Sequence, residues 1–406
     1  MAAQKRGIKL AAQGSEAGGR SDGGGRLALV VDVPTPYRIP VFNDLGDRLG
    51  SRFKVFFMAL RAPNRKWEPS LEKSRFAHEV LGGLNLRAWS GRGFGCHLNP
   101  GVGRALERFA PSLVVVGGYN HVTSFLAARN VRRLAVKLCL WCESTVHDAR
   151  NGSRFTERLK VRFIGRCDSF IVPGRASREY LATYGVTDER IFAAPNAVDS
   201  EFFREGAARA QTDEARERFR KAHFLPEFNV LFMGRLSAEK GFPVTVDVVG
   251  ALQTQGLEVG LLVVGDGPRR REYERLVSER RLRNVVFFGF VRQTELPFYY
   301  GQADVLMVPS VSEPWGLVVN EAMACGVPVL CSPVVGAGYD LVTDGVTGYR
   351  CGNAAEYAAR ILGLIEDPES KVTMSKTCRE VIAAFSPAAC AEGFLEALQA
   401  LSRVQR

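Results

Sequence analysis

Two acidic residues eight positions apart, Glu313 and Glu321, flank the point where a loop passes into an apolar, helix-like run. A proline and a glycine interrupt the backbone before that run, so we expect Glu313 in the loop and Glu321 about two turns into the helix. Free N–H groups near Gly316, Leu317 and Val318, together with the helix dipole, are suited to hold a phosphate anion. The two carboxylates then reach opposite sides of the anion. The alternative is a buried helix with one capping acid and one solvated acid.

Two further loops are candidates for contact with the same anion. Residues 229–241 read as a short apolar strand that runs into a loop with Arg235 and Lys240. A flexible basic loop after a strand can clamp a diphosphate, although two surface charges would look the same. The turn with Gly265 and Gly267 follows a second apolar strand, and its missing side chains let a ligand approach the backbone closely.

Taken together and in this order, these segments resemble the carboxy-terminal half of glycosyltransferase family 4, the retaining enzymes of the GT-B fold. The resemblance is carried by Gly-Arg-Leu-x-x-Glu-Lys-Gly at 234–241, Gly-Asp-Gly-Pro at 265–268, Glu-x7-Glu at 313–321 and Asp-Gly-x-x-Gly at 344–348. It implies two Rossmann-like α/β domains that face each other across a cleft. It also implies transfer of a sugar from a nucleoside-diphosphate sugar to an acceptor hydroxyl, on a glycan or a lipid-linked molecule of the cell surface.

The resemblance assigns roles to the donor-side residues. Arg235 and Lys240 are expected to bind the diphosphate, with help from the amides of Leu317 and Val318. Glu321 is expected to bind the ribose hydroxyls. The full set of expected donor-binding residues is Arg235, Lys240, Gly265, Gly267, Val291, Arg292, Glu313, Gly316, Leu317, Val318 and Glu321.

Glu313 is also the first expected catalytic residue, because the resemblance places it on the hydroxyls of the transferred sugar. Stabilisation of an oxocarbenium-like charge is a second role open to it. Val291 and Arg292 are expected against the base from their position alone. No Asp-x-Asp occurs in the chain, so we expect no metal requirement and no cofactor, the nucleotide sugar being a substrate.

The acceptor half matches the family less closely. Its first strand is followed by a proline-bounded segment with Tyr37 and Arg38, where relatives often have glycines. Glu143 follows a later strand, where many relatives have histidine, and it is the second expected catalytic residue, to hold the acceptor hydroxyl or accept its proton. A surface acid in a loop is the alternative. Asn120 and His121, at another strand end, complete the expected acceptor side.

Composition suits a large two-domain enzyme rather than a membrane-spanning chain. The 406 residues are 46% hydrophobic with a mean hydropathy of −0.05, enough to bury two cores. Nine cysteines, an odd number lying mostly in apolar segments, indicate reduced thiols and a cytoplasmic location. The Cys139-x-x-Cys142 spacing has no second pair, so a zinc site is not expected.

The net charge of +11 is concentrated in residues 26–199. Within them, 154–166 form a basic amphipathic helix, which could attract an anionic membrane surface at the inner membrane face. A core-packed helix with a solvated basic side is the alternative. Nucleic acid is not an expected partner, because no recognition motif accompanies the charge.

Apolar strand-like runs alternate with helix-like stretches, and the alternation restarts near residue 230. Such a pattern predicts an α/β fold with two doubly wound parallel sheets. The expected segments are a disordered tail at 1–25, an acceptor-binding domain at 26–199, a linker at 200–223, a donor-binding domain at 224–385, and a helix at 386–406 that crosses back to the first domain.

Two other functions share this architecture. One is a GT-B nucleotide-sugar epimerase, which also uses carboxylates. The other is a noncatalytic scaffold that binds a nucleotide sugar, which the altered acceptor side keeps open and the complete donor-side set disfavours.

Overall fold

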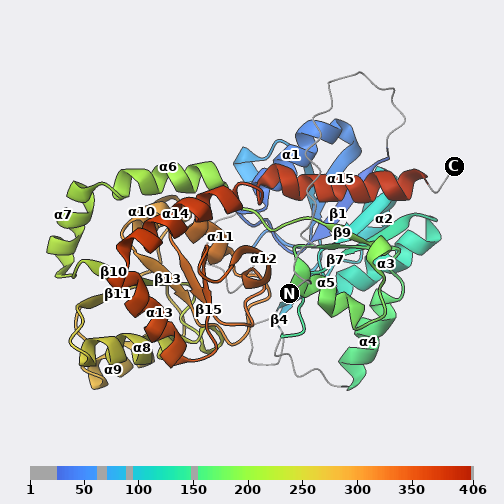
Figure 1. The fold of residues 1–406 in the computed structure, drawn as a ribbon. Coiled ribbons are helices and arrows are strands. Elements are labelled where there is room, and N and C mark those ends of the chain that lie inside the picture. Colours follow the sequence, from blue (N-terminus) through green and yellow to red (C-terminus); the bar gives the residue numbers. More distant parts are fainter. Residues whose placement is uncertain (1–24, 62–70, 88–94, 148–153, 404–406) are drawn as a thin grey trace, which may run out of the picture.

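The computed structural model describes residues 25–61, 71–87, 95–147 and 154–403, so all but the last residue of the expected tail lies outside it. Two parallel α/β domains lie side by side, and the last helix returns to the first domain (Figure 1). The doubly wound α/β architecture predicted from the alternating pattern is confirmed.

The first domain is built on a parallel sheet with strand order β3-β2-β1-β6-β7-β8-β9. Its strands are β1 Leu27–Val31, β2 Phe53–Phe57, β3 Ala77–Val80, β6 Leu113–Val116, β7 Lys137–Trp141, β8 Ser169–Val172 and β9 Ile191–Ala193. Its helices are α1 Ile39–Leu49, α2 Val102–Phe109, α3 Val122–Arg133, α4 Arg154–Ile164 and α5 Arg175–Ala182. An antiparallel pair, β4 Leu84–Arg87 and β5 Gly95–Leu98, lies outside the sheet.

Alternate side chains of the interior strand β1 enter two separate cores, as the period of a strand requires. Leu29 belongs to the core that contains residues of α1 and of the last helix, α15 Pro387–Arg403. Val30 belongs to the core that contains residues of α2, α3, α4 and α5. Both faces of the sheet are therefore covered, which explains why its strands are apolar throughout.

The second domain repeats this plan with strand order β12-β11-β10-β13-β14-β15, again all parallel. Its strands are β10 Phe228–Met233, β11 Val259–Val264, β12 Val285–Gly289, β13 Val305–Val308, β14 Val329–Cys331 and β15 Gly348–Arg350. Its helices are α8 Phe242–Thr254, α9 Arg270–Glu279, α10 Leu296–Gly301, α11 Leu317–Ala324, α12 Gly338–Leu341, α13 Ala354–Glu366 and α14 Pro368–Ile382.

Residues 200–223, which we expected as a linker, form helices α6 Ser200–Ala210 and α7 Asp213–His223. The side chains of Asp199 and Thr212 cap their N-termini. Phe203 and Phe219 enter the core of the second domain. A few apolar residues on one face are thus sufficient to fix a segment that is otherwise polar and charged.

By length and composition alone, one described helical stretch, 368–402, passes for a membrane span, although a core helix passes the same test. It comprises α14 and α15, and Met374 and Cys378 of α14 are buried in the second domain. In α15, Phe394 is buried in the first domain, where its ring packs edge-on against Trp141. The apolar residues of this stretch therefore complete both protein cores.

The basic helix α4 has both a buried and an exposed side. Phe163 is fully buried, whereas Arg158, Val161 and Arg162 are exposed. The basic side of α4 is consistent with either interpretation given for this helix.

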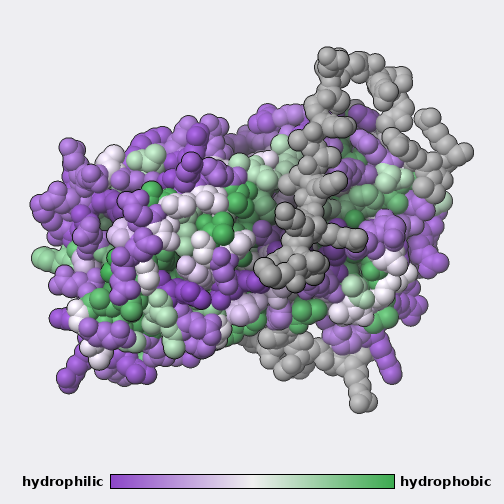
Figure 2. Space-filling model, in the orientation of Figure 1, coloured by the Kyte–Doolittle hydropathy of each residue, from purple (hydrophilic) through white to green (hydrophobic). Residues whose placement is uncertain are grey.

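On the second domain, Figure 2 shows hydrophilic side chains over the outer helices α7 and α9.

Candidate active site

The donor-side element centres on an ion pair between Lys240 and Glu313. Lys240 ends a short 3-10 helix, Ala238–Lys240, in the basic loop after β10, and its ammonium contacts the Glu313 carboxylate. Ser310 donates a hydrogen bond to the same carboxylate oxygen at 3.2 Å. The Glu313 side chain is only 11% exposed. The structure thus brings together two residues that the sequence placed 73 positions apart.

Helix α11 begins at Leu317, so Glu313 lies in the preceding loop, as the sequence predicted, and Glu321 is the fifth residue of the helix rather than two turns into it. Its N-cap, Gly316, has φ +97, a conformation that favours glycine, and no side chain caps the helix. The first amides, those of Leu317 and Val318, therefore lie at a helix N-terminus without a side-chain acceptor. This end of the helix could bind an anion beside the Lys240–Glu313 pair.

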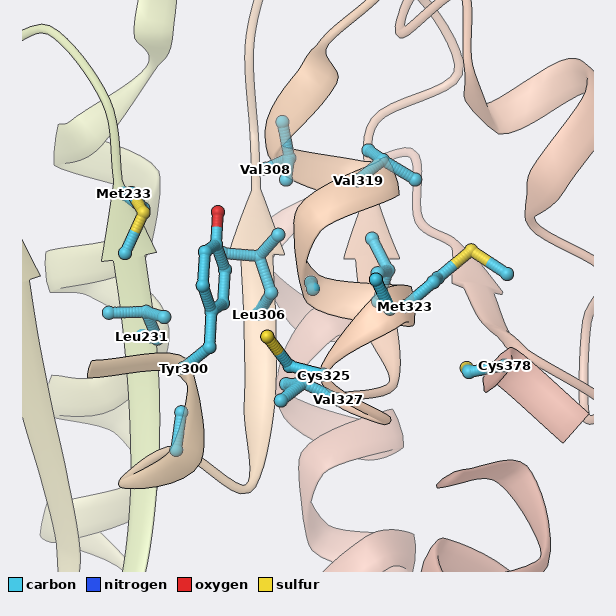
Figure 3. Close-up of a cluster of buried hydrophobic side chains, with 14 of the residues drawn as sticks. Leu231, Met233, Tyr300, Leu306, Val308, Val319, Met323, Cys325, Val327 and Cys378 are labelled. Carbon is cyan, nitrogen blue, oxygen red and sulfur yellow. The ribbon is translucent and has the colours of Figure 1, made fainter. Parts of the chain in front are cut away.

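Glu321 is a partly buried residue of α11, and Tyr300 of α10 donates a hydrogen bond to its Oε2 at 2.7 Å. Burial raises the pKa of Glu321 to about 7, and the hydrogen bond from Tyr300 opposes this shift. Figure 3 shows the ring of Tyr300 among Leu231, Met233 and Leu306, which belong to the same core. The apolar core thus fixes Tyr300, and the Tyr300 hydroxyl holds the carboxylate that we expected to bind ribose.

The glycine turn lies against the basic loop. A Cβ on Gly265, which has φ +139, would overlap the carbonyl oxygen of Gly234, and one on Gly267 would overlap that of Leu236. Both glycines are therefore required by close packing of two backbone segments. Contact with a ligand remains a separate expectation.

The other expected donor residues are more peripheral in this structure. Arg235 and Arg292 are exposed, and Val291 is partly buried at the edge of the core of the second domain. The backbone N–H of Arg292 donates to Glu295 at 3.3 Å. None of these three side chains lines either of the two hollows that lie near Glu143 and near Tyr180.

On the acceptor side, Arg38 and Glu143 form an ion pair with 3.2 Å between Nη2 and Oε1. The guanidinium of Arg38 also lies 4.2 Å from the centre of the Trp141 ring and 5.6 Å from that of Tyr37. Burial opposes the charge, but Tyr37, Glu143 and Asp32 together raise the pKa of Arg38. Arg38 therefore stays charged and holds Glu143 in place.

This pair lines a hollow between the domains, which we call the Glu143 hollow. Its walls are Arg38, Gly117, Gly118, Tyr119, Asn120, Trp141, Cys142, Glu143, Ser144 and Pro314. Pro314 directly follows Glu313, so the hollow joins the acceptor side to the donor-side element. The structure thus brings Glu143, Arg38 and Asn120 to one hollow.

Two expected acceptor residues do not line this hollow. Tyr37 packs beside Arg38, and burial raises its pKa. His121 lies with its ring 4.7 Å from that of His97 and accepts a hydrogen bond from the His97 backbone N–H. Burial lowers the pKa of His121 to about 4. His121 is consequently neutral near pH 7.

Sequence reasoning missed the contacts that join the domains. Asn320 accepts from the Trp315 indole at 2.8 Å and donates to the backbone carbonyl of Asn196 at 2.8 Å. His147 and Tyr339 are hydrogen bonded across the domains at 2.7 Å. These partners are more than a hundred residues apart, except for Trp315 and Asn320, and no short motif announces them.

No group of three or more His, Cys, Asp or Glu side chains in the described parts of the chain is arranged to hold a metal ion. The expectation that no metal is required stays a prediction.

The two α/β domains, each with a parallel sheet, and the hollow between them have the GT-B architecture. Among solved structures, Anabaena Alr3699/HepE in complex with UDP matches with a TM-score of 0.74 at 21% identity, over 92% of this chain and 100% of that one. WaaG, a glycosyltransferase involved in lipopolysaccharide biosynthesis, matches with a TM-score of 0.64 at 16% identity, over 91% and 98%. Identities this low show the fold alone.

Family models match both halves of the chain. Residues 41–202 match the model described as Glycosyltransferase Family 4, and residues 213–381 match Glycosyl transferases group 1. The chain therefore belongs to the glycosyltransferases of the family 4 type. The resemblance drawn from the motifs at 234–241 and 313–321 is confirmed.

Two of the curated relatives are also named as glycosyltransferases. A 2-deoxystreptamine glucosyltransferase from Streptomyces kanamyceticus is 33% identical over 215 residues, 52% of this chain and 54% of the relative. A D-inositol 3-phosphate glycosyltransferase from Pseudarthrobacter chlorophenolicus is 31% identical over 207 residues, 49% of this chain and 47% of the relative. The chain thus spans about half the length of the curated relatives it matches.

Proposed function

We propose that this protein is a retaining glycosyltransferase that moves a sugar from a nucleoside-diphosphate sugar to an acceptor hydroxyl. The observation that carries the proposal is the Lys240–Glu313 ion pair at the N-terminus of α11, adjoining a hollow with Glu143 on the other domain. The complexes of HepE with UDP and with UDP-glucose support a donor of this chemistry.

The donor residues act by charge and hydrogen bonding. Lys240 and Arg235 neutralise the diphosphate as it leaves, and the amides of Leu317 and Val318 bind its oxygens. Binding of the diphosphate at Lys240 frees Glu313 for the hydroxyls of the transferred sugar. Glu321, when ionised, accepts from the ribose hydroxyls.

The transfer step exchanges one bond at the anomeric carbon for another. The bond from that carbon to the diphosphate oxygen breaks, and a bond to the acceptor oxygen forms on the same face of the sugar. Arg38 engages Oε1 of Glu143, so the other carboxylate oxygen is the one to hold the acceptor hydroxyl. The acceptor proton passes to Glu143 or to the departing phosphate, and no metal is required.

The biological setting is the less specific part of the proposal. A glycan or lipid-linked acceptor of cell-surface polysaccharide or glycolipid synthesis agrees with the involvement of WaaG in lipopolysaccharide biosynthesis. Exposed Arg158 and Arg162 on α4 support a cytoplasmic protein that binds the inner membrane face through anionic lipids. Co-sedimentation with vesicles that contain phosphatidylglycerol, compared with neutral vesicles, tests this; equal sedimentation would contradict it.

The first experiment for the function is saturation-transfer NMR with UDP-, GDP- and ADP-sugars, followed by release of free nucleotide from any donor that binds. The second is Glu313→Ala in a protein that still binds the donor. Transfer should be lost, whereas a scaffold would keep its role and an epimerase would convert the donor without any acceptor. Absence of donor binding to the unaltered protein would sink the proposal.

A further inference from the structure

A second hollow of about 300 Å³ lies in the first domain beside the Glu143 hollow. We call it the tyrosine hollow; it is lined by Tyr119, Asn120, Ser144, Thr145, Val146, Glu157, Lys160, Tyr180, Thr183 and Tyr184. Tyr119, Asn120 and Ser144 line both hollows, so the two adjoin. Its volume is at the lower end of the range of about 300–1,000 Å³ found for small-molecule sites.

Hydroxyl groups form a continuous hydrogen-bonded chain along this hollow. Ser144 Oγ lies 3.2 Å from the Tyr119 hydroxyl, which lies 2.8 Å from that of Tyr180, which in turn lies 3.3 Å from that of Tyr184. At the far end, Tyr184 donates to Oε2 of Glu157 at 3.3 Å. The chain therefore runs from a carboxylate to the wall that both hollows share.

The carboxylate at one end fixes the direction of every bond in the chain, because each hydroxyl has a single proton. Tyr184 gives its proton to Glu157, so Tyr180 must donate to Tyr184 and Tyr119 to Tyr180. Ser144 must then donate to Tyr119. Both lone pairs of Ser144 Oγ are then left to accept, next to Glu143, and they can take a hydrogen bond from a sugar hydroxyl.

The charges that line the two hollows are paired. Among the described lining residues the cations are Arg38 and Lys160. Arg38 is held by Glu143, and Lys160 lies 2.6 Å from Oε1 of Glu157. Arg and Lys groups without a partner are the usual side-chain groups that bind anions in proteins. Because both cations are paired, the side chains of these walls suit hydroxyl groups better than a phosphate, although the first domain as a whole is basic.

We propose that the tyrosine hollow is an acceptor subsite that binds an uncharged, hydroxyl-rich ring, a sugar or a cyclitol, next to the ring that receives the transferred sugar. This rests on the proposed transferase function and specifies its acceptor. Any anionic group of the acceptor, such as a lipid-linked diphosphate, lies outside the hollow. Ser144 and Glu143 together accept hydrogen bonds from the hydroxyls of the acceptor at the junction of the two hollows.

The test uses the full chain, the donor nucleotide that binds it, and four probes: methyl α-glucoside, myo-inositol, glucosamine and glucose 6-phosphate. Saturation-transfer titrations are run on the unaltered protein and on Tyr184→Phe and Glu157→Gln. Tyr357→Phe, which removes a buried hydroxyl in the second domain, is the matched control. Nucleotide affinity is measured in the same samples.

The neutral probes should bind the unaltered protein better than glucosamine or glucose 6-phosphate does. Tyr184→Phe removes the bond that orients the chain, so their dissociation constants should rise about fivefold, the effect of roughly one hydrogen bond. Glu157→Gln should weaken binding of the neutral probes and, because it frees Lys160, strengthen binding of glucose 6-phosphate. Nucleotide affinity should be the same in all variants, and Tyr357→Phe should bind every probe as the unaltered protein does.

The proposal is overturned if the unaltered protein prefers glucose 6-phosphate, or if no neutral probe gives a signal that Tyr184→Phe weakens. Either result with intact nucleotide binding rejects the subsite alone. Loss of nucleotide binding in the unaltered protein would instead reject the transferase function.

Discussion

The side-chain amide of Asn320, on the second domain, donates a hydrogen bond to the backbone carbonyl of Asn196 at the end of the first domain, 2.8 Å away. Its carbonyl oxygen accepts from the Trp315 indole, which belongs to the segment between Glu313 and Glu321. A single fully buried side chain thus ties the donor-side element to the connection between the domains.

Replacement of Asn320 by Ala should lower the free energy of unfolding by about 2–4 kcal/mol, because it leaves two buried groups without partners. Urea unfolding followed by circular dichroism measures this. Gln293→Ala, at an exposed position of the second domain, serves as the control and should change stability by less than about 0.5 kcal/mol. An equal, small effect of both substitutions would show that the Asn320 bonds contribute little.

The pKa of Glu321, raised by burial to about 7, predicts a pH-dependent stability. The fold favours the protonated acid, so stability is highest below the ordinary pKa of 4.5 and falls as pH rises to about 7. We expect a loss of about 1–3 kcal/mol over this interval. Comparison with Glu321→Gln isolates the effect, because the difference in unfolding free energy between the two proteins should vary with pH. A constant difference from pH 4.5 to 8 would contradict the raised pKa.

The same carboxylate predicts a pH dependence of nucleotide binding. Only ionised Glu321 can accept from both ribose hydroxyls, so affinity should weaken as pH falls below about 7, by up to about tenfold per pH unit. Calorimetric titration from pH 5.5 to 8.5 measures it. The profile of Glu321→Gln should be nearly flat, and identical profiles would remove Glu321 from the ribose site.

The Lys240–Glu313 pair predicts different effects of its two members. Lys240→Met should raise the dissociation constant of the donor at least about tenfold, because a charge-assisted bond to the diphosphate is lost. Glu313→Gln should bind the donor but transfer slowly. Lys221→Met, an exposed lysine paired within α7, is the control for loss of charge. If Lys240→Met binds the donor as the unaltered protein does, the diphosphate lies elsewhere.

Gly265 offers a test of the packing between the two donor-side loops. A Cβ there would be strained at φ +139 and would overlap the Gly234 carbonyl, so Gly265→Ala should destabilise the protein by more than about 2 kcal/mol. At Gly256, φ is +84 but the space is open, and Gly256→Ala should cost only about 1–2 kcal/mol of strain. Thermal unfolding compares the two substitutions, and equal shifts would exclude the overlap.

The sequence predicted well where chemistry and structure are local. Glu313, Gly316 and Glu321 lie within one loop-to-helix junction, and the apolar strands of both sheets stand out because each is buried on two faces. Residues 200–223 were harder to interpret, because only a few apolar side chains, with Phe203 and Phe219 the largest buried ones, anchor two otherwise polar helices.

The acceptor side depends on distant contacts. Arg38 and Glu143 are 105 residues apart, and Tyr119 and Tyr180 are 61 apart. Nothing near any of these residues in the chain specifies its partner, so only the folded sheet reveals the Glu143 hollow and the tyrosine hollow.

The return of α15 to the first domain has a mechanical consequence. The chain passes between the domains twice, once near Asn196 and once between α14 and α15. The two passages lie close together, because the backbone of Gly393 packs on Ala193 and Phe385 lies beside Trp315, with 6.5 Å between ring centres. Two adjacent chain crossings form a hinge. They permit rotation of one domain about the line that joins them and resist sliding of one domain past the other. Opening and closing of the cleft should therefore follow one axis, with the Asn320–Asn196 hydrogen bond next to it.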